Sequence, residues 1–562
     1  MLKSALVTAL AMAANNPFLG VEAAVRTRAE ANGTFKNPIL YEDFPDNDVS
    51  VGPDGAYYLS ASNFHFSPGA PILRSYDLVD WEFVGHSIPR LNFGDGYDLP
   101  PSGERAYRGG TWASTLRYRE STGLWYWIGC TNFWITWVFT APAPEGPWTQ
   151  SGNYGGGVCF YDNGLLIDDD DTMYVVYTYD GGKQVNVTQL APDGLSTIRT
   201  EKVIVPGQVG TDSLEGNRMY KINGLYYILN DHPGSTAYVW KSDSPWGPYE
   251  GKPLADNVPG PLPGGGAPHQ GSLVPTPSGD WYFMSFTWAY PAGRLPVLAP
   301  IEFQEDGFPV LVTSNSTSTA SWGETYPLPL PRKPLNYTWA RTHYDFSTFA
   351  PATPLPPTLE FNHNPDDSNY TVGDGLTLYT ASVTPDDDLY AARNTLTHRT
   401  HGEFPSATAR LDVSAMADGD RAGLAVFRDR SAYVGVHCSG EGEEKVYEVV
   451  ARFNLTLDEW GSGETLDLGE VVERVELGSG DVGDIWLRVA MDARPDGDHT
   501  ANFEYSVDGG ETFAPIGGAY QLYTEWAFFV GYRFAIFNYA TKTLGGSVRV
   551  LSFATDSGSE EA

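Results

Sequence analysis

The chain has 562 residues, enough for two large domains with separate hydrophobic cores. Its 70 acidic and 35 basic residues give a formal net charge of −35. That charge argues against nucleic acid or an anionic membrane as a partner, whereas an uncharged polymer would suffer no repulsion. The 61 glycines and 41 prolines, together with 33 tyrosines and 16 tryptophans, indicate many turns and an all-β fold.

The N-terminal residues 1–23 are predicted to be a secretory signal peptide. Lys3 precedes the apolar stretch from Ser4 to Ala14, and Val21-Glu-Ala23 offers a small-residue cleavage site. No later stretch of the sequence approaches the ~20 apolar residues that span a bilayer. We therefore expect a secreted, extracellular monomer. Six Asn-x-Ser/Thr sequons suit secretion from a eukaryotic cell: Asn32, Asn186, Asn315, Asn336, Asn369 and Asn454.

Three cysteines are too few for a disulfide scaffold. In an oxidising compartment Cys130 and Cys159 could pair and leave Cys438 alone. The alternative is three buried thiols, and the sequence leaves this choice open.

Residues 37–331 repeat short aromatic strand patterns about every ten residues, separated by Gly, Pro, Asn and Asp. Examples are Trp125-Tyr-Trp-Ile128, Met173-Tyr-Val-Val-Tyr177, Tyr226-Tyr-Ile-Leu229 and Trp281-Tyr-Phe-Met284. A looser repeat appears in Ala143-Pro-Glu-Gly-Pro-Trp148 and Ser244-Pro-Trp-Gly-Pro-Tyr249. Four-strand units spaced by about 50 residues predict the blades of a β-propeller.

The composition changes after this region. Residues 332–358 are rich in proline and are predicted to be a semi-rigid linker. Residues 359–555 show alternating strand patterns that predict a β-sandwich, and residues 556–562 are predicted to be a disordered tail. No carboxylate pair of the second domain matches a catalytic motif, so we expect it to pack on the propeller and shape the approach of substrate.

Three segments carry acidic residues in settings that suggest chemistry. The first contains Pro45-Asp46, and Asp43 and Asp48 are alternative candidates for the catalytic aspartate of this segment. The second runs from Phe160 to Asp171 and includes Asp162, and the third contains Glu215 followed by Gly216. Inverting glycoside hydrolysis needs one carboxylate to activate water and one protonated carboxyl about 6.5–9.5 Å away to protonate the leaving oxygen. The innermost strands of propeller blades can bring such distant residues to one axis.

These segments resemble glycoside hydrolase family 43 over nearly the whole mature chain. The resemblance implies a five-bladed propeller followed by a concanavalin-like sandwich (jelly-roll) domain. It also implies that Asp46 is the base, Asp162 tunes the acid and orients substrate, and Glu215 is the general acid. The proline that usually follows each aspartate is replaced, by Asn47 and Asn163. Asp43 or Asp48 therefore stays an alternative to Asp46.

The same resemblance suggests residues that bind substrate. His269 and Arg294 match family segments whose histidine and arginine reach the central pocket, and aromatic rings can pack on the apolar faces of sugars. The aromatic candidates are Phe64, Phe66, Trp112 and Tyr161. His269 could instead coordinate a central cation, bind water or be a hydrogen-bonded core residue. Any single aromatic residue could equally belong to the core.

No metal or cofactor is expected to be required for the chemistry, and a structural Ca²⁺ is left possible. The acidic run from Asp168 to Asp171 could suggest calcium, but a hairpin turn is the preferred interpretation. The sequence contains no Gly-x-Ser-x-Gly, His-Glu-x-x-His or phosphate-loop motif.

The segment Phe64-His-Phe-Ser-Pro-Gly-Ala-Pro-Ile72 looks most like fungal family members that remove α-L-arabinofuranose from xylan. The resemblance therefore implies a secreted, inverting enzyme whose partner is hemicellulose, namely arabinoxylan. One alternative is an exo-acting β-1,4-xylosidase acting on xylo-oligosaccharides. Another, of a different class, is a carbohydrate-binding propeller without catalysis.

Overall fold

The computed structural model describes residue 30 and residues 33–558, apart from residues 101–102, 155–156, 158, 315–319, 334, 336–340, 459, 461 and 480–481. These residues form β-strands and short 3-10 turns, with no α-helix among them. The expected all-β class is confirmed. No helix in this part of the chain is long and apolar enough to cross a bilayer. The expected signal peptide, residues 1–23, lies outside the described residues.

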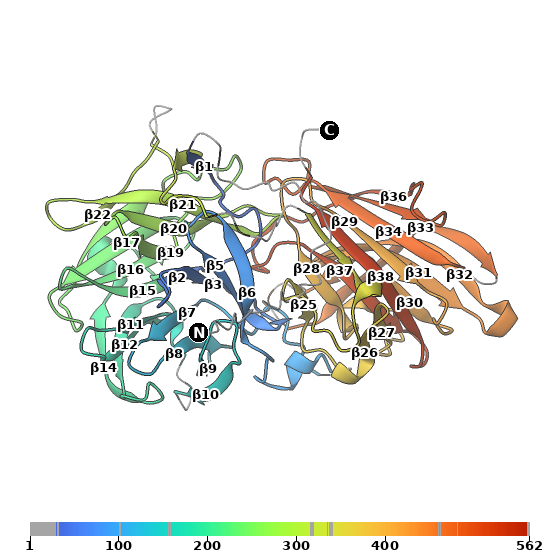
Figure 1. Ribbon diagram of the computed structural model, residues 1–562, viewed down its shortest axis with the longest axis horizontal. Coiled ribbons are helices and arrows are strands. Elements are labelled where there is room, and N and C mark those ends of the chain that lie inside the picture. The colour runs from blue at the N-terminus through green and yellow to red at the C-terminus, as the bar shows by residue number, and fades with distance from the viewer. Residues whose placement is uncertain are drawn as a thin grey trace, which may run out of the picture.

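Five antiparallel four-stranded sheets form the N-terminal propeller, at the left of Figure 1. The first sheet contains β2 (Asp48–Val51), β3 (Tyr57–Ser60), β5 (Gly69–Ser75) and β6 (Trp81–Ile88). The second contains β7 (Ser114–Arg119), β8 (Leu124–Thr131), β9 (Ile135–Ala141) and β10 (Thr149–Asn153). The third contains β11 (Tyr161–Ile167), β12 (Met173–Tyr179), β13 (Gln184–Leu190) and β14 (Thr197–Ile204), followed by the 3-10 turn η2 (Pro206–Val209).

The last two blades follow the same order. The fourth contains β15 (Glu215–Ile222), β16 (Leu225–His232), β17 (Thr236–Ser242) and β18 (Glu250–Asp256). The fifth contains β19 (Gly271–Pro275), β20 (Trp281–Trp288), β21 (Arg294–Phe303) and β22 (Pro309–Leu311). The chain segments before the first blade and after the fifth blade also pair, through β1 (Thr34–Lys36) and β23 (Thr325–Pro327). The expected five-bladed arrangement is therefore confirmed.

The first strand of each blade is its innermost strand, and these strands are neighbours around the axis. The middle strands are apolar on both faces because each sheet is covered by a blade on either side. In β12, for example, residues Met173 to Tyr177 are all buried. Apolar clusters fill the spaces between neighbouring blades, such as the one that joins Val176 and Val187 to Ile228 and Trp240. This packing holds the starts of the innermost strands in fixed positions.

A disulfide bond and a hairpin turn settle two questions that the sequence left open. Cys130 and Cys159 form a disulfide bond, and Cys438 is a buried free thiol. The acidic run joins β11 to β12 as a hairpin turn, in which the Asp171 N–H donates to the Asp168 carbonyl oxygen. Asp168 pairs with Lys221, and Asp171 pairs with Arg119. The run is therefore a turn held by ion pairs.

Two eight-stranded antiparallel sheets form the C-terminal sandwich, at the right of Figure 1. One contains β26 (Tyr370–Val372), β27 (Leu376–Tyr379), β38 (Ser547–Asp556), β29 (Ser406–Asp412), β34 (Asp484–Met491), β35 (Thr500–Ser506), β36 (Ala514–Gln521) and β24 (Arg341–Asp345). The other contains β33 (Thr465–Ser479), β32 (Val446–Leu457), β31 (Arg430–Ser439), β30 (Asp420–Phe427), β37 (Arg533–Ala540), β28 (Leu396–Arg399), β25 (Leu359–Asn362) and β4 (Phe66–Ser67). Short 3-10 turns connect some strands: η1 (Asp95–Asp98), η3 (Phe346–Thr348), η4 (Asp367–Asn369), η5 (Leu389–Ala391) and η6 (Gly442–Glu444).

The expectation that residues 332–358 form only a linker is wrong for part of the segment. Strand β24 pairs with β38 along its whole length. Tyr344 and Phe346 are buried in the core of the sandwich. These two apolar side chains lie at alternate positions, as in a half-buried strand. The many prolines around them made the segment look like a linker in the sequence. At the other end, Asp556 still pairs in β38, so the expected tail begins one residue too early.

The two domains share a sheet as well as an interface. Strand β4 leaves the first propeller blade and pairs with β25 at the edge of the sandwich. Beside it, the fully buried carboxylate of Glu360 contacts three basic side chains: Arg399 (Nη1 at 3.0 Å), Arg533 (Nη1 at 2.5 Å) and His86 of the propeller (Nε2 at 2.7 Å). Both guanidinium groups also donate to Asn63 of the propeller. Glu360 thus compensates two buried cations that join the domains.

We expect Glu360→Gln to lower the free energy of unfolding by about 3–5 kcal/mol, because two guanidinium groups would lose their buried counter-charge. Chemical denaturation followed by tryptophan fluorescence measures the change. The matched control is Glu324→Gln, since Glu324 contacts Lys36 on the surface and its side chain is 65% exposed. The control should cost less than about 1 kcal/mol. Equal effects of the two substitutions would contradict the role given to Glu360.

Candidate active site

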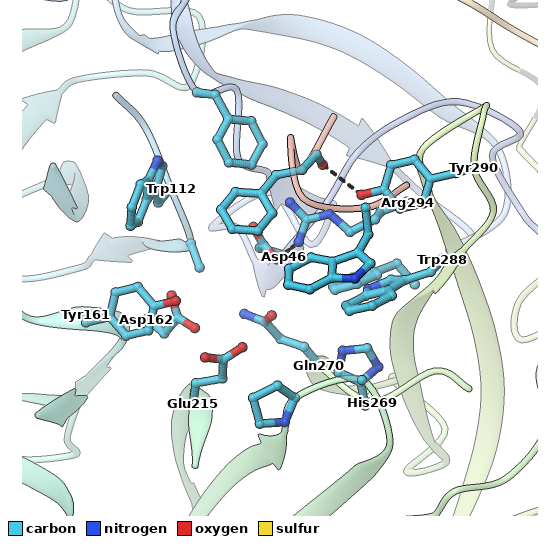
Figure 2. A pocket seen from close by; sticks show the side chains of 17 residues that line it. Asp46, Trp112, Tyr161, Asp162, Glu215, His269, Gln270, Trp288, Tyr290 and Arg294 are labelled. Atoms are coloured by element: carbon cyan, nitrogen blue, oxygen red, sulfur yellow. Dashed lines mark hydrogen bonds and ion pairs between the residues drawn. The ribbon is translucent and has the colours of Figure 1, made fainter. Parts of the chain in front are cut away.

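A cavity of about 400 Å³ opens where the innermost strands of the propeller begin. Each blade contributes to it: Asp46 just before β2, Trp112 just before β7, Asp162 in β11, Glu215 at the start of β15 and Gln270 just before β19. Figure 2 shows the side chains of Asp46, Asp162 and Glu215 directed into the same space. The structure therefore brings the three predicted carboxyl groups together in one pocket.

Asp46 occupies a left-handed backbone conformation, with φ of 57°, and is 7% exposed. Its Oδ1 accepts a hydrogen bond from Arg294 Nη1 at 2.6 Å, and its Oδ2 accepts one from Ser62 Oγ at 2.5 Å. Asn47, in place of the usual proline, donates from Nδ2 to the Ser285 carbonyl oxygen at 3.0 Å. The asparagine side chain thus ties this loop to the fifth blade.

The two rivals of Asp46 point elsewhere. Asp43 accepts hydrogen bonds from the backbone N–H groups of Arg294 and Gly531, at 2.7 and 3.0 Å. Asp48 is fully buried and pairs with Arg117 and Arg218. Burial opposes ionisation of Asp48, but these two guanidinium groups hold its pKa below the usual value. Neither residue lines the cavity, so the geometry favours Asp46 as the group that faces substrate.

Asp162 is also left-handed, with φ of 48°, at an irregularity in the pairing of β11 with β12. Its Oδ2 accepts the Gly216 N–H at 3.1 Å. Burial raises the pKa of Asp162 well above its ordinary value, and the nearby carboxyls of Glu215 and Asp46 raise it further. Asn163, the second replacement for proline, donates to the Phe160 carbonyl oxygen. Asp162 therefore positions the peptide that follows Glu215.

Glu215 is the first residue of β15 and lies at an irregularity in its pairing with β16. Burial raises its pKa to about 7, and the charge of Asp46 acts in the same direction. Arg294 and a hydrogen bond from Tyr161 oppose this shift. A carboxyl with this pKa is protonated in mildly acidic solution, as a general acid must be.

A fourth carboxyl, Asp231, escaped the sequence reasoning. It lies opposite Glu215 in the register of β15 and β16, is fully buried, and neither of its carboxyl oxygens has a hydrogen-bond partner among the described residues. Burial, followed by the charges of Glu215, Asp162 and Asp46, raises its pKa well above the ordinary value. Gly216, with φ of 71°, makes room for it, since a Cβ there would lie 2.0 Å from Asp231 Oδ1. No local motif marks Asp231, which meets the site only through strand pairing.

Most of the predicted substrate-binding residues line the cavity. Trp112 and Tyr161 are half-buried, with ring centroids 6.1 Å apart, and Arg294 is buried and lines the same cavity. The prediction that Phe66 binds substrate is wrong. Phe66 does not line the cavity, and its ring lies 3.5 Å from the Arg533 guanidinium at the domain interface. Phe64 lines the cavity instead. The chain turns away from the propeller between these two phenylalanines because β4 begins at Phe66.

His269 is buried and lines the cavity. Its Nδ1 lies 2.8 Å from the Ala267 carbonyl oxygen, which can only accept a hydrogen bond. Burial lowers its pKa to about 4, so the ring is neutral and Nδ1 carries the proton. Nε2 is then a hydrogen-bond acceptor. Among the residues that the structure describes, no group of three or more His, Cys, Asp or Glu side chains is placed to hold a metal ion.

The sandwich completes the wall of the pocket through the loop between β36 and β37. Trp526 and Phe529 of this loop line the cavity. Trp526, 42% exposed, stacks on Trp288 of the fifth blade with ring centroids 5.6 Å apart. The Phe529 carbonyl oxygen accepts a hydrogen bond from Tyr290 at 3.1 Å, drawn as a dashed line in Figure 2. Among the residues that the structure describes, the second domain thus supplies aromatic surface and no carboxyl group to the cavity.

Carboxyl groups gathered in one pocket at the axis of a propeller suit glycoside hydrolysis, which needs an acid and a base on either side of the bond. Glycosyl hydrolases family 43 matches residues 35–309, and the Beta xylosidase C-terminal Concanavalin A-like domain matches residues 346–553. The chain belongs to glycosyl hydrolases family 43, and it is a glycoside hydrolase.

Three similar proteins illustrate the range of the family. A GH43 enzyme, solved in work that engineered its active site to display both endo-xylanase and exo-arabinofuranosidase activity, is 42% identical, with a TM-score of 0.85 over 93% of this chain and 99% of that one. A beta-xylosidase of Formosa agariphila is 25% identical over 94% of this chain and 91% of that protein. A non-reducing end alpha-L-arabinofuranosidase of Bacteroides ovatus is 31% identical over 50% of this chain and 54% of that protein.

Replacement of Glu215 by Gln should lower kcat/KM on natural glycosides by about 10²–10⁴-fold, because the leaving oxygen would lose its proton donor. The loss should be much smaller on 2,4-dinitrophenyl glycosides, whose leaving group needs little protonation. The control is Glu201→Gln on β14, where the glutamate side chain is 49% exposed and pairs with Arg199. Equal losses on both kinds of substrate would argue against Glu215 as the acid.

The pH dependence of kcat/KM provides an independent check on Glu215. A general acid works only while protonated, so activity should fall as the pH rises through the pKa of about 7. An ordinary glutamate would already lose its proton near pH 4.3. The measurement is an initial-rate profile between pH 4 and 9 with a natural oligosaccharide, whose leaving group needs protonation. A basic limb centred below pH 5.5 would contradict the burial argument.

Proposed function

We propose that this glycoside hydrolase removes α-L-arabinofuranosyl side chains from arabinoxylan with inversion of configuration. The observation that supports the proposal best is the gathering of Asp46, Asp162 and Glu215 around one pocket, with both oxygens of Asp46 already hydrogen-bonded and Glu215 inclined to stay protonated. An inverting reaction needs a carboxylate held in place as the base and a protonated carboxyl group as the acid.

In the proposed reaction the sugar lies between the two carboxyl groups. Glu215 gives its proton to the glycosidic oxygen as the bond to the anomeric carbon breaks. Asp46 removes a proton from a water molecule that attacks this carbon from the opposite face. Arg294 and Ser62 fix the Asp46 carboxylate, so that its remaining lone pairs are directed at the water. Asp162 holds the Gly216 peptide and thereby the direction of the Glu215 side chain.

The similar proteins support arabinofuranose as the sugar. The arabinofuranosidase activity named for the 42% identical structure and for the Bacteroides ovatus protein points to arabinofuranosides. Full-length similarity to a beta-xylosidase keeps β-1,4-xylosidase as the second candidate. Arabinofuranose and xylopyranose present similarly placed hydroxyl groups, so one pocket design can serve either sugar.

Secretion is part of the proposal. Support comes from the N-terminal apolar segment of the sequence and from the disulfide between Cys130 and Cys159, which suits an oxidising compartment. The sequons differ in accessibility. The Asn186 side chain is buried in β13, whereas Asn454 is exposed in β32. Asn32, Asn315 and Asn336 lie outside the described residues.

Incubation with wheat arabinoxylan, followed by anion-exchange chromatography of the released sugars, tests the proposal. Arabinose should be the main product, and Glu215→Gln should slow its release by the factor expected for natural glycosides. Xylose from linear xylo-oligosaccharides, without arabinose from the polymer, would replace the proposal by the β-xylosidase alternative. Binding of the polymer without any released sugar would indicate a carbohydrate-binding protein.

A further inference from the structure

Gln270 lies in the pocket between the two carboxyls that carry the proposed reaction. Its side chain is 4% exposed, and it lines the cavity. Figure 2 shows its carboxamide between Asp46 and Glu215, directed into the open space. The Nε2 atom is buried and has no hydrogen-bond partner among the described residues. A buried amide donor of this kind is destabilising while it stays unpaired, so it needs an acceptor.

The surrounding backbone confines this side chain. The Gln270 carbonyl oxygen accepts a hydrogen bond from Ser285 Oγ at 2.7 Å, which fixes the start of β19 to the next strand. Its stem packs over Gly216, where a Cβ would lie 2.8 Å from Cγ and 3.1 Å from Cδ of Gln270. The end of the side chain is therefore held where the pocket begins, and its amide faces whatever fills the pocket.

The pocket has many hydrogen-bond acceptors and few free donors. Asp46 and Nε2 of His269 accept, and a sugar hydroxyl that donates to either of them can in turn accept from another group. Within the described part of the chain, three buried donors that line the cavity have no partner: Gln270 Nε2, Trp288 Nε1 and Arg294 Nε. Arg294 already donates a hydrogen bond from Nη1 to Asp46. Gln270 is the neutral donor beside the Gly216 peptide and the general acid.

We propose that Gln270 is a substrate-binding residue whose carboxamide donates a hydrogen bond to one ring hydroxyl of the sugar in the pocket. This contact holds the sugar against the Asp162–Glu215 side of the site and disfavours sugars that lack that hydroxyl. The proposal rests on the proposed function only in its need for a pentose in the pocket, and either an arabinofuranose or a xylopyranose would satisfy it.

The test is a cycle of one substitution and a set of deoxy sugars. The substitution Gln270→Met keeps the length of the side chain and removes its donor. Substrates are 4-nitrophenyl α-L-arabinofuranoside and its 2-, 3- and 5-deoxy analogues. We expect the substitution to lower kcat/KM on the parent substrate by about 10- to 100-fold. On one deoxy analogue the variant and the wild type should react equally, while the other two should keep the full loss.

The outcome that overturns the proposal is a loss of the same size on all four substrates, or a change below twofold on the parent. The matched control is Gln304→Met, since Gln304 is exposed in the turn after β21 and should show wild-type rates. If Gln270→Met does not fold, judged by its thermal transition, Gln270→Asn enters the same cycle, because it withdraws the amide by one methylene.

Failure of the arabinofuranosidase assignment is separable from failure of this inference. If the wild type hydrolyses 4-nitrophenyl β-D-xylopyranoside and not the arabinofuranoside, the same cycle runs with the 2-, 3- and 4-deoxy xylosides. If Gln270→Met and the wild type then react equally on one deoxy xyloside, while the variant keeps its full loss on the other two, the contact with xylopyranose is supported. Uniform losses would reject the contact while leaving the xylosidase activity established.

Discussion

The buried carboxylate of Asp43 joins the two halves of the active site, although it takes no part in the proposed chemistry. One oxygen accepts the backbone N–H of Arg294 in the propeller, and the other accepts the backbone N–H of Gly531 in the sandwich. Arg294 holds Asp46, and Gly531 ends the loop that carries Trp526 and Phe529. A single carboxylate thus fixes the proposed base relative to the aromatic wall of the pocket.

The same region depends on a balance between many buried acids and few free cations. Asp162, Glu215 and Asp231 are removed from water, and each has a raised pKa because burial disfavours its charged form. The guanidinium of Arg294 is committed to Asp46. The charge of Arg294 also opposes the rise in the pKa of Glu215, which burial and the charge of Asp46 bring to about 7. Arg294 therefore acts on both carboxyl groups of the proposed reaction.

The parts of the structure that follow from local sequence could be predicted. Aromatic strand runs between tight turns indicated the blades, and the motifs shared with the family indicated Asp46, Asp162 and Glu215, which lie in or just before innermost strands. What failed depends on contacts distant in the chain. Asp231 meets Glu215 only through strand pairing, and Trp526 reaches the pocket from the far end of the second domain. Phe64 and Phe66 look alike in sequence, and only the departure of β4 toward the sandwich separates their roles.

The stereochemistry of the first product tests the central claim, that Asp46 activates water opposite the acid Glu215. Proton NMR of the anomeric signal during early hydrolysis of an α-L-arabinofuranoside, or of a β-D-xyloside if that is the substrate, gives the answer. If Asp46 has this role, the anomer opposite to that of the substrate appears first and later mutarotates. First appearance of the anomer that matches the substrate would contradict it, because retention requires a carboxylate to attack the sugar directly.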